Sequence, residues 1–161
     1  MLIEQPLSAS AHDRSAFTCG TPALDEYLQR FALQQSKKHV SNVYVLIDDA
    51  QPSTILGYYT LSAAQVDAAQ LSDADQRKLP HYPVPCFRMG RLACALKAQG
   101  TGMGKILMGL AVERCLQARQ QVASYALIVD AKDDKAAAFY LKYGFTACTS
   151  APLTLYLPLG S

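Results

Sequence analysis

The chain has 161 residues, of which 50% are hydrophobic and 17% are charged, and its formal net charge at pH 7 is +2. This length and composition are typical of one folded domain and exclude a disordered chain. The small net charge gives no general attraction to nucleic acid, so binding to a polyanion requires a local basic patch. We therefore expect a single domain over residues 1–161.

Cysteine spacing and hydropathy indicate the compartment. The five cysteines are widely spaced without a CxxC pair, and the three histidines lie far apart. Buried thiols in a reducing cytoplasm explain this pattern better than disulfides, and we expect no metal site. No run approaches the roughly 20 apolar residues of a membrane span. The first residues also lack the basic and apolar parts of a secretory signal, so we expect a cytoplasmic protein.

The first half of the chain predicts a helix followed by a hairpin. The helix begins with Thr21 as its cap and Pro22 in its first turn. One buried face of this helix follows from the spacing of Leu24, Tyr27, Leu28 and Phe31. The segments "NVYVLID" (42–48) and "TILGYYTLSA" (54–63) then predict two antiparallel strands. Gly57, inside the second strand, indicates a bulge or a close approach of another backbone.

The second half alternates strands with helices. "LSDADQRKLP" (71–80) predicts a helical turn, and "CFRMGRLACA" (86–95) predicts a strand. A helix over 104–119 follows, and "SYALIVDA" (124–131) then reads as a strand buried on both faces. "DDKAAAFYLKYGF" (133–145) predicts a helix with acidic residues at its positive end, and "LTLYL" (153–157) a last strand. The order indicates a layered α/β domain on a mixed sheet.

The stretch "AQGTGMGKILMG" (98–109) contains four of the nine glycines. Glycines between a strand and a helix let an anionic group approach the N–H groups of the helix N-terminus. A nucleoside-triphosphate P-loop does not fit, because Gln99 and Ile106 occupy two of its fixed positions. A dinucleotide fingerprint does not fit either, because Lys105 stands at its last glycine.

The segment "RLACALKAQGTGMGKILM" resembles the coenzyme A loop of the GCN5-related N-acetyltransferases (GNAT), whose signature is Q/R-x-x-G-x-G/A. "DDKAAAFYLKYGF" is similar to the late helix of that family, which carries an aromatic pair before a "GF" turn. The resemblance covers about residues 40–157. It implies the GNAT fold, an α/β fold with a mixed, mostly antiparallel central sheet flanked by helices, and acetyl-CoA as the cofactor.

Further segments narrow the resemblance. "FTCGTPALDEYLQRFALQQSKK", "PVPCFRMGRLA" and "APLTLYL" resemble acetyltransferase toxins of bacterial toxin–antitoxin pairs. That likeness implies acetylation of the α-amino group of aminoacyl-tRNA, a block of translation, a ribbon-helix-helix antitoxin as partner, and a homodimer. Two alternatives stay open: an acetyltransferase for a protein N-terminus or a small-molecule amine, and a binder of coenzyme A without catalysis.

The family resemblance also implies roles for residues that would hold the cofactor. The backbone of Leu92, Ala93 and Cys94 is expected along the pantetheine arm. The diphosphate is expected on Gln99, Gly100, Thr101, Gly102, Met103, Gly104 and Lys105. Asp133 stands where many members carry an asparagine that contacts the cofactor. Cys94 is either a small apolar strand residue or, less in keeping with the family, a nucleophile that carries the acyl group.

Catalysis and acceptor binding involve further residues. The resemblance implies that Tyr140 is the acid that protonates the sulfur of coenzyme A, a role that suits a phenol with an ordinary pKa of about 10. A general base is not evident, although Asp130 and Asp133 are candidates by position and water is the alternative. Candidate contacts for RNA are Arg88, Arg91 and Lys97. Arg88 and Arg91 cannot face the same way on a regular strand, because they are three residues apart.

Overall fold

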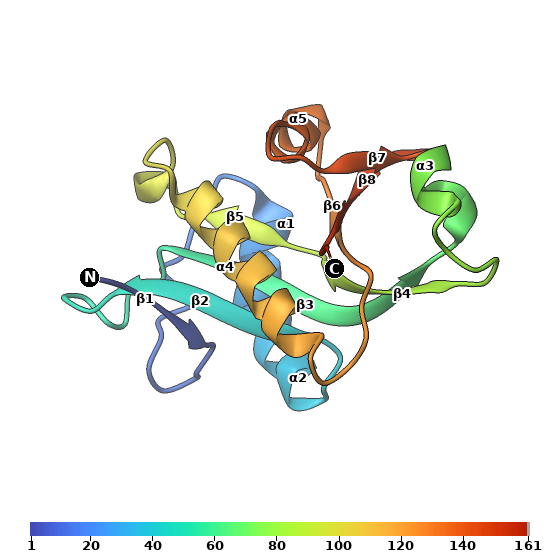
Figure 1. The fold of residues 1–161 in the computed structure, drawn as a ribbon. Coiled ribbons are helices and arrows are strands. Elements are labelled where there is room, and N and C mark those ends of the chain that lie inside the picture. Colours follow the sequence, from blue (N-terminus) through green and yellow to red (C-terminus); the bar gives the residue numbers. More distant parts are fainter. Residues whose placement is uncertain (161) are drawn as a thin grey trace. The chain divides into compact units, whose positions relative to one another are not determined.

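The computed structural model describes residues 1–160 (Figure 1). These residues belong to two compact units. Unit 1 contains residues 1–62 and 91–111, and unit 2 contains residues 63–90 and the chain from residue 112 onward. The strands follow the hydrogen-bonding order β1-β2-β3-β4-β6-β8-β7, and β5 pairs with β3. All recorded strand pairs are antiparallel except β4 with β6. The expected mixed, mostly antiparallel sheet is confirmed.

Unit 1 is built on an antiparallel meander. β1 (Leu2–Pro6) pairs with β2 (Asn42–Asp48), and β2 pairs with β3 (Gly57–Val66), so the predicted hairpin is confirmed. β5 (Leu92–Cys94) pairs with the first residues of β3. β1 was not predicted from the sequence, because "LIEQP" is short and has no clear alternation, and its pairing with β2 is what makes it a strand.

The predicted helix near the N-terminus consists of three parts, α1 (Pro22–Glu26), the π-helical turn η1 (Tyr27–Phe31) and α2 (Ala32–Lys37). The expected cap is wrong in one respect, because the side chain of Thr21 accepts no capping hydrogen bond. The expected buried face is only partly correct, since Tyr27 and Leu28 are buried but Phe31 is 42% exposed. A π turn contains more residues than an α turn, so the apolar positions beyond it rotate out of register.

Helices cover both faces of the sheet in unit 1. Tyr58 points to the face of α1, where its hydroxyl donates to the Leu24 carbonyl at 2.6 Å and its ring stacks on that of Tyr27. The neighbouring residue, Gly57, faces the opposite side, where a Cβ atom added to it would lie 2.6 Å from Leu107 of α4 (Met103–Ala118). The close approach predicted from this glycine is therefore confirmed.

Unit 2 contains β4 (Val84–Met89), β6 (Ala126–Asp130), β7 (Thr146–Cys148) and β8 (Ala151–Pro158). β6 lies between β4, which is parallel to it, and β8, which is antiparallel. All four residues from Ala126 to Val129 are buried, as the apolar run predicted. This unit also contains α3 (Asp73–Gln76), the second half of α4 and α5 (Asp134–Lys142), and α5 packs against β8.

The strand predicted over residues 86–95 is in fact two strands, β4 and β5, separated by Gly90 and Arg91. The Arg91 N–H donates to the side-chain Oγ1 of Thr60 at 3.1 Å, and the Thr60 N–H donates to the Arg91 carbonyl. The Thr60 side chain thus accepts the Arg91 N–H in place of a main-chain carbonyl, which interrupts the strand pairing at this point. Within residues 1–160, no helix combines the length and apolarity needed to cross a membrane.

Candidate functional site

The glycine-rich loop connects the short 3-10 turn η3 (Leu96–Ala98) with the N-terminus of α4. Gly100 and Gly102 have φ angles of +78° and +85°, which side chains rarely adopt. A Cβ atom added to either glycine would meet no heavy atom within 4 Å. The loop therefore leaves open space beside its backbone, ahead of a helix whose first N–H groups carry partial positive charge. This arrangement fits an anionic ligand.

Gln99 fixes the start of this loop. Its side-chain Nε2 donates to the carbonyl of Cys19 at 2.8 Å and to the carbonyl of Cys94 at 3.0 Å. Thr101 Oγ1 donates to the carbonyl of Ala98. The loop is thus bound to the end of β5 and to the segment before α1. The sequence marked Gln99 by its family position, whereas its two carbonyl partners became visible only in the structure.

Within residues 1–160, β5 pairs with a strand on one side only, and on its other edge the Cys94 carbonyl accepts the hydrogen bond from Gln99. Residues Leu92 and Cys94 lie opposite Tyr59 and Gly57 of β3, and no other strand is paired with β5 among the described residues. An extended ligand with amide groups can therefore bind along the other edge. Burial raises the pKa of the Cys94 thiol to about 11, so the thiol is neutral at pH 7. This favours an apolar strand residue over a covalent nucleophile.

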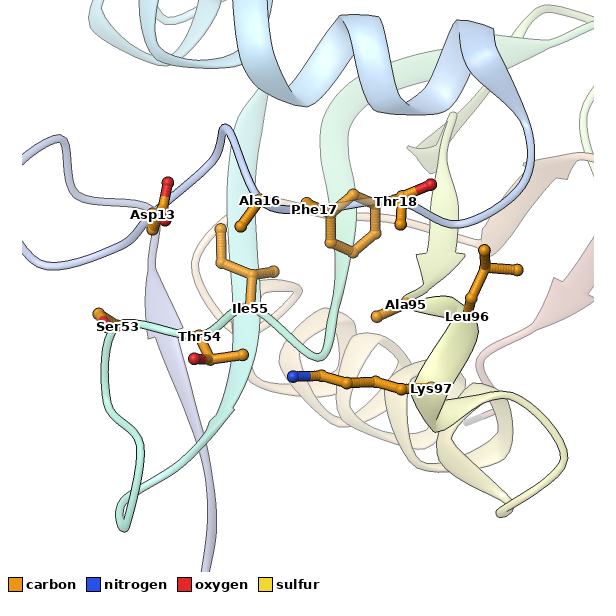
Figure 2. Close-up of a pocket in the computed structure, with 10 residues that line it drawn as sticks. All are labelled: Asp13, Ala16, Phe17, Thr18, Ser53, Thr54, Ile55, Ala95, Leu96 and Lys97. Carbon is orange, nitrogen blue, oxygen red and sulfur yellow. The ribbon is translucent and has the colours of Figure 1, made fainter.

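Two of the predicted basic residues, Arg91 and Lys97, also lie in unit 1. The Arg91 guanidinium carbon is 3.6 Å from the centroid of the Tyr27 ring. Lys97 lines a cavity of about 330 Å³ between residues 13–18, the turn at 53–55 and residues 95–97. Figure 2 shows its amine extending across the cavity toward Thr54 and Ile55. No local pattern in the sequence indicates this cavity, because its three walls are far apart along the chain.

Unit 2 contains the predicted acid. Tyr140 lies on α5 and is only 5% exposed, and its ring packs against Phe139 and Phe145 at centroid distances of 5.3 Å. Asp133 occupies the N-cap of the same helix, where its Oδ1 accepts a hydrogen bond from the Ala136 N–H at 2.8 Å. Asp133 thus caps α5, in keeping with the acidic residues that the sequence places at the positive end of this helix.

Arg88 and Asp130 form an ion pair in unit 2. Arg88 Nη1 donates to both carboxylate oxygens of Asp130, at 2.8 Å and 2.7 Å. The two residues are 42 positions apart, and they meet because β4 and β6 are parallel neighbours. Each residue stands out separately in the sequence, but no local pattern predicts the pair.

The predicted site residues fall into two groups. Unit 1 brings the strand at 92–94 and the loop at 99–105 together with Arg91 and Lys97, and unit 2 holds Tyr140, Asp133 and Arg88. Within the described part of the chain, no three histidine, cysteine or acidic side chains are grouped as metal ligands.

The chain is similar to known acetyltransferases. The family model described as "Acetyltransferase (GNAT) domain" matches residues 39–147. A "tRNA-acetylating toxin" of Mycobacterium tuberculosis is 34% identical over 149 residues, which are 92% of this chain and 87% of the relative.

Two solved structures are similar over nearly the whole length. AtaT complexed with acetyl-methionyl-tRNAfMet is 29% identical with a TM-score of 0.91, and the match covers 98% of this chain and 95% of that one. A tyrosine-to-phenylalanine mutant of AtaT, bound to the C-terminus of the antitoxin AtaR and acetyl-CoA, is 27% identical with a TM-score of 0.84 and coverages of 98% and 93%. The chain therefore belongs to the GNAT family of acetyltransferases, as its glycine loop and late helix predicted.

Proposed function

We infer that this protein is an acetyl-CoA-dependent N-acetyltransferase that acetylates the α-amino group of aminoacyl-tRNA and thereby acts as a toxin that blocks translation. The observation that carries this proposal is the similarity, over 98% of the chain, to a structure described as AtaT complexed with acetyl-methionyl-tRNAfMet. The relative named as a tRNA-acetylating toxin supports the same activity. The proposal assigns residues 1–161 to one N-acetyltransferase domain.

The residues of unit 1 fit the cofactor. The open space beside Gly100 and Gly102, together with the N-terminus of α4, suits the diphosphate. The edge of β5 that faces away from β3 suits the amide groups of the pantetheine arm, with Leu92, Ala93 and Cys94 as the binding residues. When bound, acetyl-CoA supplies an acetyl thioester as the electrophile. Lys105 adds a positive charge in the first turn of α4, and Asp133 is the residue of unit 2 assigned to the cofactor.

Tyr140 is the proposed general acid. Attack by the amine forms the new C–N bond and breaks the C–S bond, and the departing sulfur needs a proton. The Tyr140 hydroxyl gives that proton and recovers one from solvent, while water takes the proton that the amine loses. A phenol suits this step because its ordinary pKa of about 10 keeps it protonated at neutral pH.

The acceptor and the partners follow from the same relatives. Arg88, Arg91 and Lys97 are the proposed contacts for RNA, since phosphate groups attract lysine and arginine. The AtaT structure with the C-terminus of AtaR supports an antitoxin partner, which we expect to be a ribbon-helix-helix protein. We further propose that the enzyme is a homodimer that acts in the cytoplasm, where charged tRNA is found.

The test is incubation with labelled acetyl-CoA and charged tRNA. We expect label on the aminoacyl group with the wild-type protein and a loss of at least about a hundredfold with Tyr140→Phe, the scale of a lost general acid. Tyr143→Phe, on the same stretch of chain, is the matched control and should remain active. Label on proteins or on small amines but not on tRNA would contradict the proposed acceptor and favour the alternative acetyltransferase.

A further inference from the structure

The ion pair between Arg88 and Asp130 leaves some hydrogen-bonding groups of both side chains without a partner among the described residues. One nitrogen, Arg88 Nη1, serves both oxygens of Asp130, and within the described residues neither side chain has another hydrogen-bond partner. The side chains are 37% and 39% exposed. Pairs that are this exposed contribute little to stability. Lone pairs of the carboxylate and N–H groups of the guanidinium therefore remain available to a ligand.

The pair lies at the carboxyl ends of the two parallel strands of this mixed sheet. β4 and β6 are parallel, and Arg88 lies opposite Ile128 in their register. Arg88 is the next-to-last residue of β4 and Asp130 is the last residue of β6, so both lie at the carboxyl ends of the strands. Ligands of α/β sheets bind outside the carboxyl ends of parallel strands. The chain then leads from Asp130 directly into α5, which carries Tyr140.

The α-amine of an aminoacyl acceptor must be neutral to react, whereas a nearby carboxylate favours its charged ammonium form. An amine attacks a thioester only in its neutral form, which has the free electron pair. An isolated carboxylate within about 4–6 Å of the amine stabilises the ammonium form and raises its pKa by about 1–3 units. A carboxylate that is already paired with a guanidinium has no net charge to offer. Its oxygen still accepts a hydrogen bond.

We propose, on the basis of the aminoacyl-tRNA acetylation proposed above, that Arg88 and Asp130 form the subsite for the acceptor amine. Asp130 accepts a hydrogen bond from the neutral α-amino group and orients its electron pair. Arg88 neutralises the charge of the carboxylate, so that the carboxylate does not raise the pKa of the amine. The remaining guanidinium N–H groups face the phosphate or ribose of the same terminal nucleotide. Arg88 and Asp130 are thus positioning residues, and neither exchanges a proton with the substrate.

Two thiols close to the pair do not supply this charge balance. Cys86 of β4 and Cys148 of β7 interact electrostatically with Arg88, and Cys148 also with Asp130. Burial raises the pKa of both thiols, that of Cys86 to about 11, so both are neutral at the pH of the reaction. The remaining strand neighbour of Asp130 is Thr154 of β8, which does not titrate.

The test is the pH dependence of kcat at saturating charged tRNA, which reports ionisations in the enzyme–substrate complex, for Arg88→Gln, Asp130→Asn and the double variant. Arg88→Gln leaves an unpaired carboxylate and should move the acidic limb of the profile upward by about one pH unit. Asp130→Asn keeps an oxygen acceptor without negative charge, so it should lower kcat without that upward shift. The double variant should lose the shift, and Arg88→Lys should restore the wild-type limb. Arg119→Gln, which removes a half-buried arginine bonded to the Gly160 carbonyl, is the matched control.

A binding measurement without acetyl-CoA gives a second readout. The probe is a short RNA hairpin that carries methionine at its 3′ end through a stable amide, and its affinity is measured at pH 6 and pH 8. For each protein we take the ratio of its affinity at pH 6 to its affinity at pH 8. This ratio should be up to about tenfold higher for Arg88→Gln than for wild type, because one pKa unit corresponds to a factor of ten. Equal ratios, together with an unshifted profile, would overturn the subsite. A wild-type enzyme that leaves charged tRNA unlabelled would instead contradict the proposed function, and the subsite with it.

Discussion

The guanidinium of Arg91 stacks on the ring of Tyr27, with 3.6 Å between the guanidinium carbon and the ring centroid. Tyr27 in turn stacks on Tyr58 at 6.4 Å with an angle of 14° between the rings. The main chain of Arg91 is bound to Thr60 through both its N–H and its carbonyl. The residue that precedes β5 is therefore held from two sides, by the sheet and by the helix that covers it.

This stacking predicts a measurable contribution to stability. Arg91→Ala should lower the free energy of unfolding by about 1 kcal/mol, since a partly buried cation–π contact contributes about 0.5–2 kcal/mol. Urea denaturation of Arg91→Ala, Tyr27→Leu and the double variant measures the coupling between the two residues. Arg91→Lys should retain part of the coupling, because an ammonium lacks the planar stacking surface. Strictly additive losses would show that the two side chains do not interact.

The close approach at Gly57 predicts a cost for any side chain there. In Gly57→Ala the new Cβ would lie 2.6 Å from Leu107 Cδ1 and 2.9 Å from the Ala93 carbonyl oxygen, and backbone cannot yield as a side-chain tip can. The variant should lose about 1–3 kcal/mol of stability through overpacking. Gly109→Ala on α4 is the control, because its Cβ meets nothing within 4 Å. That change should stabilise the protein by up to about 1 kcal/mol through helix propensity. Equal thermal midpoints for the two variants would contradict this difference.

Asp75 connects the short helix α3 to β8 through Tyr156. The Tyr156 hydroxyl donates to Asp75 Oδ2 at 2.7 Å and accepts from the Ser72 N–H at 2.9 Å. The hydrogen bond from Tyr156 is the main cause that lowers the pKa of Asp75 below its ordinary value. A carboxyl with a lowered pKa contributes stability above the pKa it has in the unfolded chain. That contribution disappears as the pH falls below about 4 and through the folded value.

Tyr156→Phe should therefore destabilise the protein by about 1 kcal/mol at pH 7, the usual contribution of a hydrogen bond. The difference from wild type should shrink between pH 4 and pH 2, as measured by urea denaturation at each pH. Asp75→Asn provides the control background, in which the effect of Tyr156→Phe should not depend on pH. A loss at pH 7 that persists unchanged at pH 2 would assign the effect to packing of the ring instead.

The sequence predicted the elements better than it predicted their ends. Hydrophobic spacing identified the helix over residues 22–37, but no local residue pattern marks the π turn at Tyr27–Phe31 that exposes Phe31. The break between β4 and β5 depends on Thr60, which lies 31 residues away from Arg91. Such features are decided by tertiary contacts, which residue patterns do not record.

The features of the candidate site also fall into those that local sequence patterns predict and those that depend on tertiary contacts. The glycine loop could be predicted because closely spaced glycines and a following helix are local features. The Arg88–Asp130 pair could not, because it requires the strand order that makes β4 and β6 neighbours. The cavity beside Lys97 has walls from three separate segments and is equally invisible to local patterns.

The two hydrogen bonds of Gln99 predict how strongly two substitutions at this residue weaken acetyl-CoA binding. Gln99→Ala removes donors to the Cys19 and Cys94 carbonyls, and it should weaken acetyl-CoA binding about tenfold if the loop loses about 1.4 kcal/mol of ordering. Gln99→Glu should be worse, because a carboxylate would face two carbonyl oxygens and repel the diphosphate. Calorimetric titration with acetyl-CoA measures both, with the exposed Gln117→Glu on α4 as the control. An affinity of Gln99→Glu equal to that of Gln99→Ala would mean that the loop does not bind an anion.

A substitution at Gly102 should affect acetyl-CoA affinity more strongly than it affects the stability of the fold. In Gly102→Ala the Cβ meets no protein atom within 4 Å, so the only cost to the fold is the φ of +85°, about 1–2 kcal/mol for a residue with a side chain. Acetyl-CoA affinity should fall much further, by at least tenfold, because the methyl group occupies the space assigned to the diphosphate.

Gly160→Ala is the matched control, with a φ of +83° and equally open surroundings at a position outside the loop. It introduces similar backbone strain but should leave acetyl-CoA affinity unchanged. Thermal unfolding with and without acetyl-CoA distinguishes the two effects, since a ligand that binds the folded state raises the midpoint. If Gly102→Ala gained as much thermal protection from acetyl-CoA as Gly160→Ala, the diphosphate would have to bind elsewhere.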